Sequence, residues 1–237
     1  LIFDLEDSVI NEDKEIARSN FKKINYHSPI SHAVRINPIQ SQDFEKDLEL
    51  INTFNNNYDR IVIPKIGNRD ELDAYIKILP TDKPLEIQIE SCRSVINLKE
   101  IASHPKVESL SFGPLDFLAD LGAPVFSARE WSKEIRNLLT HTLSQIIVAG
   151  HAYDKYVYDG PTTILEDEYL IQDTQLAFNL GADGKWLIHP SQIEKFQEIF
   201  LNADEKLLDE KEFTQGSIKR NSEMFDAASL RISDNRK

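Results

Sequence analysis

The sequence is poor in cysteine and has no long apolar run. Cys92 is the single cysteine in 237 residues, which excludes an intramolecular disulfide and fits a reducing compartment. No apolar stretch approaches the roughly 20 residues that span a bilayer, and no signal peptide is recognisable. We therefore expect a cytoplasmic protein that has no membrane partner.

Positive charge is also scarce. The chain has 27 Lys and Arg against 40 Asp and Glu, which gives a formal net charge of −13. A surface of this sign repels nucleic acid and anionic membranes, so neither is an expected partner. An anionic substrate would need a locally positive pocket or a metal ion to overcome the general field.

Short apolar runs alternate with amphipathic helical patterns along most of the chain. The predicted strands are Leu1–Leu5, His32–Ile36, Arg60–Pro64, Leu85–Ile89, Val107–Phe112, Tyr156–Tyr158 and Lys185–Ile188. The predicted helices include Asp13–Ile24, Arg69–Leu79, Ser94–Ser103, Arg129–Ala149 and Asp167–Leu180. Alternation of this kind indicates an α/β fold with a parallel sheet.

A count of about seven strands leaves two architectures open. One is a (β/α)₈ TIM barrel whose first β/α unit is absent from this chain, and the other is an open, doubly wound sheet. No glycine-rich phosphate fingerprint follows the first strand, which favours the barrel. We expect residues 1–200 to form this barrel.

The alternation of strand and helix patterns ends after Pro190. Helical patterns cover Ser191–Phe200 and Asp204–Leu208, whereas Lys211–Lys237 is polar and has no strand pattern. We therefore expect residues 201–237 to form a helical extension, which packs on the barrel as a lid or on a neighbouring subunit.

Polar residues close the predicted strands one after another. They are Asp4, Glu6, Asp7, Arg35, Asn37, Lys65, Glu90, Gly113, Asp116, Asp159 and His189. In a parallel barrel the carboxyl ends of all strands open onto one face, where catalytic groups gather. The sequence therefore predicts an active site built from these residues.

Several of these residues are carboxylates, which repel one another unless a cation lies between them. Mg²⁺ prefers oxygen ligands and uses few protein carboxylates. We expect Glu90 and Asp116, on consecutive strand ends, to be direct ligands, and Glu6 and Asp7 to hold metal-bound waters. The alternative for each acid is a helix cap or a solvated loop position.

The remaining polar residues fit a substrate site. Arg35 offers a planar fork suited to a carboxylate or enolate oxygen, although an ion pair with Glu6 or Asp7 is an alternative. Lys65 could bind an anion or pair with a nearby acid. His189 is expected near the substrate or as a hydrogen-bonding strut, and Gly113 and Pro114 complete the predicted substrate-binding set.

The strand-end motifs resemble those of the citrate lyase β-subunit, malyl-CoA lyase and citramalyl-CoA lyase family, which is HpcH/HpaI aldolase-like. The matching segments are residues 1–9 (LIFDLEDSV), 35–38 (RINP), 63–65 (IPK), 89–91 (IES), 111–122 (SFGPLDFLADLG) and 181–192 (GADGKWLIHPSQ). The resemblance implies a barrel whose second strand is the first one seen here. It also implies Mg²⁺-dependent cleavage of a carbon–carbon bond between an acyl-thioester enolate and a 2-oxo acid.

Carried onto this chain, the resemblance implies that Glu90 and Asp116 hold the metal, and that Arg35 binds the oxygen where negative charge develops. The segment 221–226 (NSEMFD) is similar to one whose aspartate reaches a neighbouring subunit's site, which makes Asp226 the expected acid/base of a homotrimer or hexamer. Departures from the family pattern are Ser222, Ala227 and Leu143-Ser144, where the family has glycine, proline and an arginine–serine pair.

The function expected from these motifs is Mg²⁺-dependent cleavage of a 3-hydroxyacyl-CoA, such as malyl-CoA or citramalyl-CoA, into an acyl-CoA and a 2-oxo acid. Two enzymatic alternatives keep the metal: a citryl-thioester lyase subunit, and a CoA-independent 2-oxo-acid aldolase. An alternative of another class is a catalytically inactive binding or scaffold subunit.

Overall fold

Seven parallel strands form one sheet. The computed structural model describes residues 1–24, 30–125, 127–201, 217–220 and 223–226. The strands are β1 (Ile2–Asp4), β2 (Ala33–Arg35), β3 (Arg60–Ile63), β4 (Leu85–Ile89), β5 (Val107–Phe112), β6 (Tyr156–Asp159) and β7 (Gly184–Lys185). They lie in the order β1-β2-β3-β4-β5-β6-β7, and every neighbouring pair is parallel. A doubly wound sheet reverses its strand order at a switch point, so that alternative was wrong.

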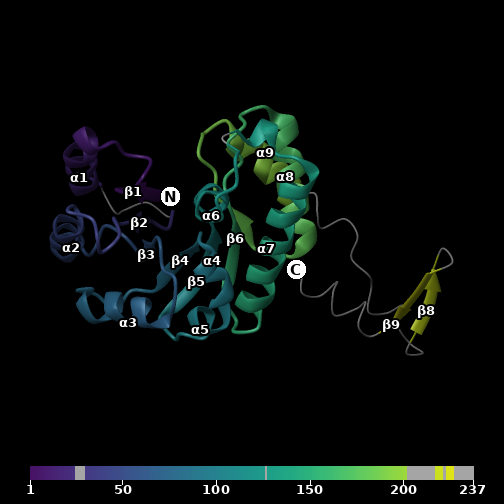
Figure 1. The fold of residues 1–237 in the computed structure, drawn as a ribbon, viewed down its shortest axis with the longest axis horizontal. Coiled ribbons are helices and arrows are strands. Elements are labelled where there is room, and N and C mark those ends of the chain that lie inside the picture. Colours follow the sequence, from purple (N-terminus) through teal and green to yellow (C-terminus); the bar gives the residue numbers. More distant parts are fainter. Residues whose placement is uncertain (25–29, 126, 202–216, 221–222, 227–237) are drawn as a thin grey trace.

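Helices follow the strands, with α1 and α2 at the left of Figure 1 beside the first strands and α7 and α8 at the right beside β6. They are α1 (Lys14–Lys22), α2 (Phe44–Thr53), α3 (Arg69–Ile78), α4 (Cys92–Ile96), α5 (Leu98–Ala102), α6 (Pro114–Asp120), α7 (Lys133–His151), α8 (Asp167–Leu180) and α9 (Gln192–Leu201), with 3₁₀ turns at Asn11–Asp13 and Ala128–Glu130. Among the residues described, no helix is both long and apolar enough to cross a membrane.

Local hydrogen bonds explain where the structure departs from the expected boundaries. The predicted helix Ser94–Ser103 is split into α4 and α5 at Asn97, whose side-chain amide bonds the carbonyls of Gly67 and Arg93. Strand β7 stops after Lys185, since the Ile188 amide turns toward the Gln192 side chain. Such side-chain bonds compete with regular secondary structure.

Within the predicted helical extension over residues 201–237, the structure describes two short strands. Here the described residues contain β8 (Ser217–Arg220) and β9 (Glu223–Asp226), which pair antiparallel with Ser217 opposite Asp226. The helix predicted over Asp204–Leu208 lies outside the described residues, and the lid or subunit contact stays a prediction.

The strands carry apolar residues on their helix-facing side and polar residues on the inner side. In β4, Ile87 and Ile89 belong to the apolar core, whereas Glu86 and Gln88 alternate with them and bond other inner side chains. Successive side chains of a strand point to opposite faces, so this alternation places the polar set inside the curved sheet.

Inner side chains also meet across the sheet. Arg60 at the start of β3 donates to the Tyr158 hydroxyl of β6 at 3.3 Å, although two strands lie between them. A flat sheet with strands about 4.8 Å apart would hold these strands too far apart for such a contact. The sheet is therefore curved around its polar face, as in a barrel.

A buried lysine anchors the loop after β1. The Lys14 ammonium donates to the carbonyls of Leu5 at 2.9 Å and Glu6 at 3.1 Å, and to Asn37 Oδ1 at 2.8 Å. Its side chain is buried, since Lys14 is only 6% exposed. These bonds fix the segment that carries Glu6 and Asp7 against the end of β2.

We expect Lys14→Met to destabilise the fold by about 3 kcal/mol, because three buried oxygens lose a charged donor. The free energy of unfolding in urea measures this effect. Lys22→Met, at an exposed site on the same helix, is the matched control and should change stability by less than about 0.5 kcal/mol. Equal effects of the two variants would contradict the anchoring role.

Candidate active site

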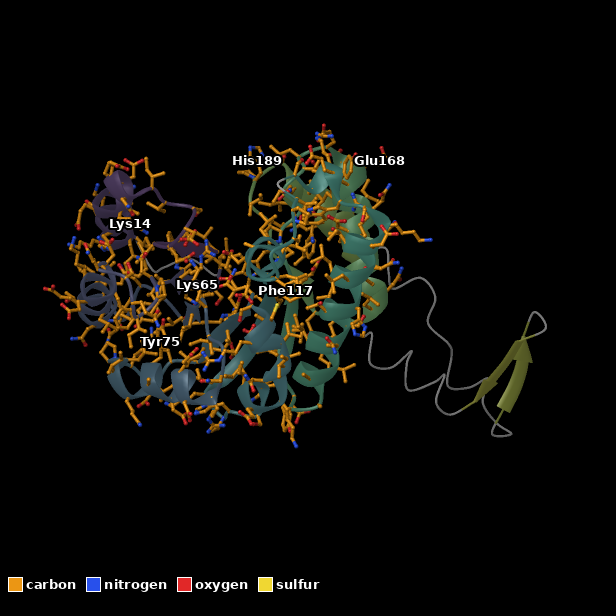
Figure 2. All side chains as sticks on the ribbon, viewed as in Figure 1. Lys14, Lys65, Tyr75, Phe117, Glu168 and His189 are labelled. Atoms are coloured by element: carbon orange, nitrogen blue, oxygen red, sulfur yellow. The ribbon has the colours of Figure 1, made fainter. Side chains whose placement is uncertain are left out.

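The carboxyl ends of the first five strands bring most of the predicted site residues together. Glu6 follows β1, Arg35 ends β2, Lys65 follows β3 and Glu90 follows β4. Asp116 lies in the first turn of α6, just after β5. Figure 2 shows Lys65 near the middle of the molecule, between the two sets of helices.

Arg35 is held by an acid that was not among its predicted partners. Its Nε and Nη2 donate to the two carboxylate oxygens of Asp4 at 2.7 and 2.5 Å, while Nη1 donates to Gln88 at 3.2 Å and lies 3.4 Å from Glu6 Oε2. Burial acts to lower the pKa of Arg35, but the bonds and charge of Asp4, together with the charges of Glu6 and Glu90, outweigh it and raise that pKa. The guanidinium is therefore a fixed cation.

Lys65 pairs with the acids after β1. Its ammonium lies 2.9 Å from Glu6 Oε1 and 2.6 Å from Asp7 Oδ2. Burial acts to lower the pKa of Lys65, but these two carboxylates outweigh it and raise that pKa. The backbone of Lys65 is left-handed, with φ of 59°, and its amide donates to Glu90 Oε1 at 2.7 Å. One residue thus connects Glu6 and Asp7 with Glu90.

The two acids after β1 have opposite pKa shifts. Burial raises the pKa of Glu6, which is 1% exposed, against the opposing bonds from the Asp7 amide and Lys65. Burial also acts to raise the pKa of Asp7, but there the hydrogen bonds from Lys65 and Glu6, together with the charges of Lys65 and Arg35, outweigh it and lower that pKa. Both acids are thus tied to Lys65, the pairing that the sequence left open for that lysine.

Glu90 is a buried acid close to a second one. It is 4% exposed, and burial together with the nearby charge of Asp116 raises the pKa of Glu90 to about 8. Among the described residues, the one hydrogen bond to the Glu90 carboxylate comes from the backbone amide of Lys65. A bound cation would offset this cost of ionisation.

Glycine at position 113 makes room for that carboxylate. A Cβ on Gly113 would lie 2.6 Å from Glu90 Cβ and 2.7 Å from Glu90 Oε2. The Gly113 amide donates to the Ile89 carbonyl at 2.9 Å, and Pro114 begins α6, where its missing N–H costs nothing. Helix α6 therefore starts directly against Glu90 and presents Asp116 from its first turn.

The donor set fits a magnesium ion. Glu90 and Asp116 are two carboxylates that interact electrostatically at one end of the sheet. The described part of the chain contains no group of three or more His, Cys, Asp or Glu side chains that could hold a metal ion. Mg²⁺ often uses only one or two protein carboxylates and keeps water or substrate at its other positions, so a pair is sufficient.

A cavity of about 680 Å³ opens beside this cluster. Its lining includes Asp4, Arg35, Gln88, Asp116 and Trp186. It therefore brings the fixed cation of β2 and the acid of α6 to one space, which is large enough for a small ligand.

The structure does not bring His189 to the cluster, and it does not describe the side chain of Asp226. His189 is exposed, bonds the Ser191 hydroxyl at 2.8 Å, and lies well away from Lys65 in Figure 2. Its hydrogen bond to Ser191 agrees with the alternative given for His189, a structural hydrogen-bonding role. Asp226 ends β9, and its side chain lies outside the described part of the structure.

Sequence comparison identifies relatives along most of the chain. Residues 1–190 match the sequence model described as HpcH/HpaI aldolase/citrate lyase. A (3S)-malyl-CoA thioesterase of Cereibacter sphaeroides is 30% identical over 204 residues, which cover 84% of this chain and 68% of the relative. An L-malyl-CoA/β-methylmalyl-CoA lyase of Rhodobacter capsulatus is 27% identical and covers 93% and 77% of the two chains.

Solved structures agree with this assignment. The citrate lyase β-subunit of Mycobacterium tuberculosis, solved with oxaloacetate and magnesium, superposes with a TM-score of 0.71 at 26% identity and covers 84% of this chain and 85% of that chain. RipC of Yersinia pestis gives a TM-score of 0.70 at 27% identity, with 84% and 86% covered. Together with the strand-end geometry, these matches confirm the predicted family and its enzyme class. The chain belongs to the HpcH/HpaI aldolase/citrate lyase family of carbon–carbon lyases.

Proposed function

We propose that this chain is a Mg²⁺-dependent lyase that cleaves a 3-hydroxyacyl-CoA, such as malyl-CoA or citramalyl-CoA, into an acyl-CoA and a 2-oxo acid. The observation that carries the proposal is the buried Glu90 beside Asp116, on the same side of the sheet as the fixed cation Arg35. The malyl-CoA lyase of Rhodobacter capsulatus and the magnesium-bound citrate lyase β-subunit support this choice of substrate and metal.

Glu90 and Asp116 would hold the metal, and Glu6 and Asp7 would order its water molecules. When bound, Mg²⁺ supplies a Lewis acid that polarises the oxygen of the hydroxy or oxo acid. The high pKa of Glu90 supports this assignment, since a buried carboxylate ionises readily only beside a cation.

Arg35 would bind the thioester oxygen, where negative charge develops as the carbon–carbon bond breaks. Asp4 fixes the guanidinium before substrate arrives, so little reorganisation is needed as the enolate forms. Lys65, Gly113 and Pro114 would contact the substrate around it. His189, which bonds Ser191, fits a structural role better than substrate contact.

Asp226 would exchange a proton with the acyl carbon, from a neighbouring subunit of a homotrimer or hexamer. The test is complementation between two inactive variants. Mixed oligomers of Asp226→Ala and Glu90→Ala chains should regain activity, because some sites would combine an intact Glu90 with an intact Asp226. No recovery, with mixed oligomers demonstrated by mass spectrometry, would contradict this role.

Hydrolysis of the thioester is a second candidate, since a 30% identical relative is a (3S)-malyl-CoA thioesterase. Incubation with malyl-CoA and Mg²⁺ separates the two by their products. A lyase yields acetyl-CoA and glyoxylate, whereas a thioesterase yields malate and free CoA. Cleavage of a free hydroxy acid would favour the CoA-independent aldolase, and cleavage of a citryl thioester only would favour the citrate lyase subunit. No turnover of any of these compounds would favour an inactive subunit.

The stabilisation by Mg²⁺ should increase between about pH 6 and about pH 8. Without metal, Glu90 has a pKa of about 8 in the folded chain against 4.5 for the ordinary side chain. Between these values the folded state binds more protons than the unfolded state, so Glu90 makes stability fall as the pH rises. Mg²⁺ binding requires the ionised acid and opposes this fall.

Thermal unfolding with and without saturating Mg²⁺ at both pH values measures the effect. Glu90→Gln is the control, because glutamine does not titrate, and its response to Mg²⁺ should be small at either pH. A wild-type response of equal size at both pH values would contradict the prediction.

A further inference from the structure

An indole ring lies against the guanidinium of Arg35. The Arg35 Cζ atom is 5.4 Å from the ring centroid of Trp186, which is within the range of a cation–π contact. Trp186 directly follows β7, whereas Arg35 ends β2, so the contact joins strands from opposite ends of the sheet order. Both residues line the cavity that also contains Asp116.

The same indole is fixed at its other edge by a buried acid. Trp186 Nε1 donates to Glu86 Oε1 at 2.9 Å. Glu86 is 2% exposed, and its second oxygen accepts a bond from Ser109 at 3.4 Å and lies 3.8 Å from Arg60 Nη1. The Trp186 amide also donates to the Asp159 carbonyl at 2.9 Å. The ring therefore has a defined position before any ligand binds.

The Asp4 carboxylate and the Trp186 ring contact different parts of the Arg35 guanidinium. The two bonds to Asp4 lie in the guanidinium plane and fix its position within that plane. The third nitrogen, Nη1, donates to Gln88 at 3.2 Å and lies 3.4 Å from Glu6 Oε2. The Trp186 ring, whose centroid lies 5.4 Å from Arg35 Cζ, adds a cation–π contact that opposes movement of the guanidinium away from this position.

We propose that Trp186, oriented by Glu86, is a positioning residue that holds the guanidinium plane of Arg35 toward the substrate. This inference rests on the function proposed above. Trp186 touches the binding arginine and acts through it, and Glu86 acts through Trp186.

The contact can be tested without substrate. The chain has two tryptophans, so Trp131→Phe leaves Trp186 as the sole indole. In this background, Glu86→Gln should shift the NMR signal of the Trp186 indole N–H, and Arg35→Lys should change the fluorescence emission of Trp186. Circular dichroism confirms that each variant is folded. Folded variants that leave both signals unchanged would overturn the inference.

The kinetic test compares two replacements of Trp186 in the otherwise unchanged chain. Trp186→Leu removes the aromatic face and should lower kcat for thioester cleavage about tenfold, with Mg²⁺ affinity unchanged. Trp186→Phe retains a ring over Arg35 and should recover most of that loss. A Leu variant as active as the wild type, or Phe and Leu variants that are equally impaired, would overturn the positioning role.

A ligand titration separates failure of this inference from failure of the proposed function. Acetyl-CoA with Mg²⁺ should change the emission of Trp186 in the Trp131→Phe background, and Arg35→Lys should abolish that change. If no CoA thioester is cleaved but this response is seen, the lyase function is overturned and the positioning of Arg35 is supported. If thioester is cleaved but the emission does not respond, the inference is overturned.

Discussion

Replacing Glu90 by glutamine should lower Mg²⁺-dependent cleavage about a thousandfold, because the proposed metal site would lose one of its two charged ligands. Glutamine keeps the shape of the side chain, and its oxygen can still accept the bond from the Lys65 amide. The folded chain should therefore persist. At about pH 8 without metal it should be at least as stable as the wild type, since a buried acid with a pKa of about 8 is replaced by a neutral amide.

Initial rates, Mg²⁺ affinity by calorimetry and urea unfolding together test this prediction. Glu100→Gln, on the exposed side of α5, removes the same charge far from any proposed ligand and should leave all three unchanged. A Glu90→Gln enzyme that retains full Mg²⁺-dependent activity would remove Glu90 from the metal site. A variant that fails to fold would contradict the assumption that the site is not needed for stability.

Gly113→Ala should lower activity about a hundredfold through the position of Glu90 alone. The added Cβ would come within 2.6 Å of Glu90 Cβ and 2.7 Å of its Oε2, so the carboxylate must move. The φ of Gly113 is −105°, which alanine adopts without strain. The expected loss therefore comes from steric displacement of the Glu90 carboxylate. If Glu90 binds the metal as proposed, Mg²⁺ affinity should fall with the rate.

Gly67→Ala is the matched control for this substitution. Its Cβ would meet Arg93 Cδ at 3.0 Å, but this is part of an exposed and flexible side chain that can shift. Activity should remain near that of the wild type. The double variant Gly113→Ala/Glu90→Gln should be no less active than Glu90→Gln, because both changes act on one carboxylate. If the activity losses of the two single variants multiply in the double variant, then Gly113 affects activity through something other than the Glu90 carboxylate.

The sequence was sufficient to predict which residues gather at one end of the sheet. Parallel strands place their carboxyl ends together, so Arg35, Lys65, Glu90 and Asp116 could be grouped without coordinates. The partner of Arg35 could not be predicted in the same way. Asp4 and Arg35 are direct partners in the β1–β2 register, and register depends on tertiary pairing that a single sequence does not reveal.

The same limit applies to residues whose partners are distant in the sequence. Lys14 lies on the first helix, where a lysine is usually exposed to solvent. Its ammonium is instead buried and donates to Asn37, which lies 23 positions away. Trp186 was predicted to lie within an apolar strand, whereas its indole bonds Glu86, 100 positions earlier. The pairing of β8 with β9 was missed because four-residue polar strands carry little periodic signal.

The left-handed backbone at Lys65 sets stability and activity against each other. A lysine at φ of 59° costs about 1 kcal/mol that glycine would not, because glycine has no Cβ to crowd the preceding carbonyl. Glycine at position 65 would relieve this strain but would also remove the ammonium that pairs with the buried Glu6 and with Asp7. Random mutagenesis screened only for heat resistance would therefore be expected to enrich glycine together with changes that neutralise these two acids. Selection for turnover would act in the opposite direction, so the residue found at this position in an evolved population would report which pressure prevailed.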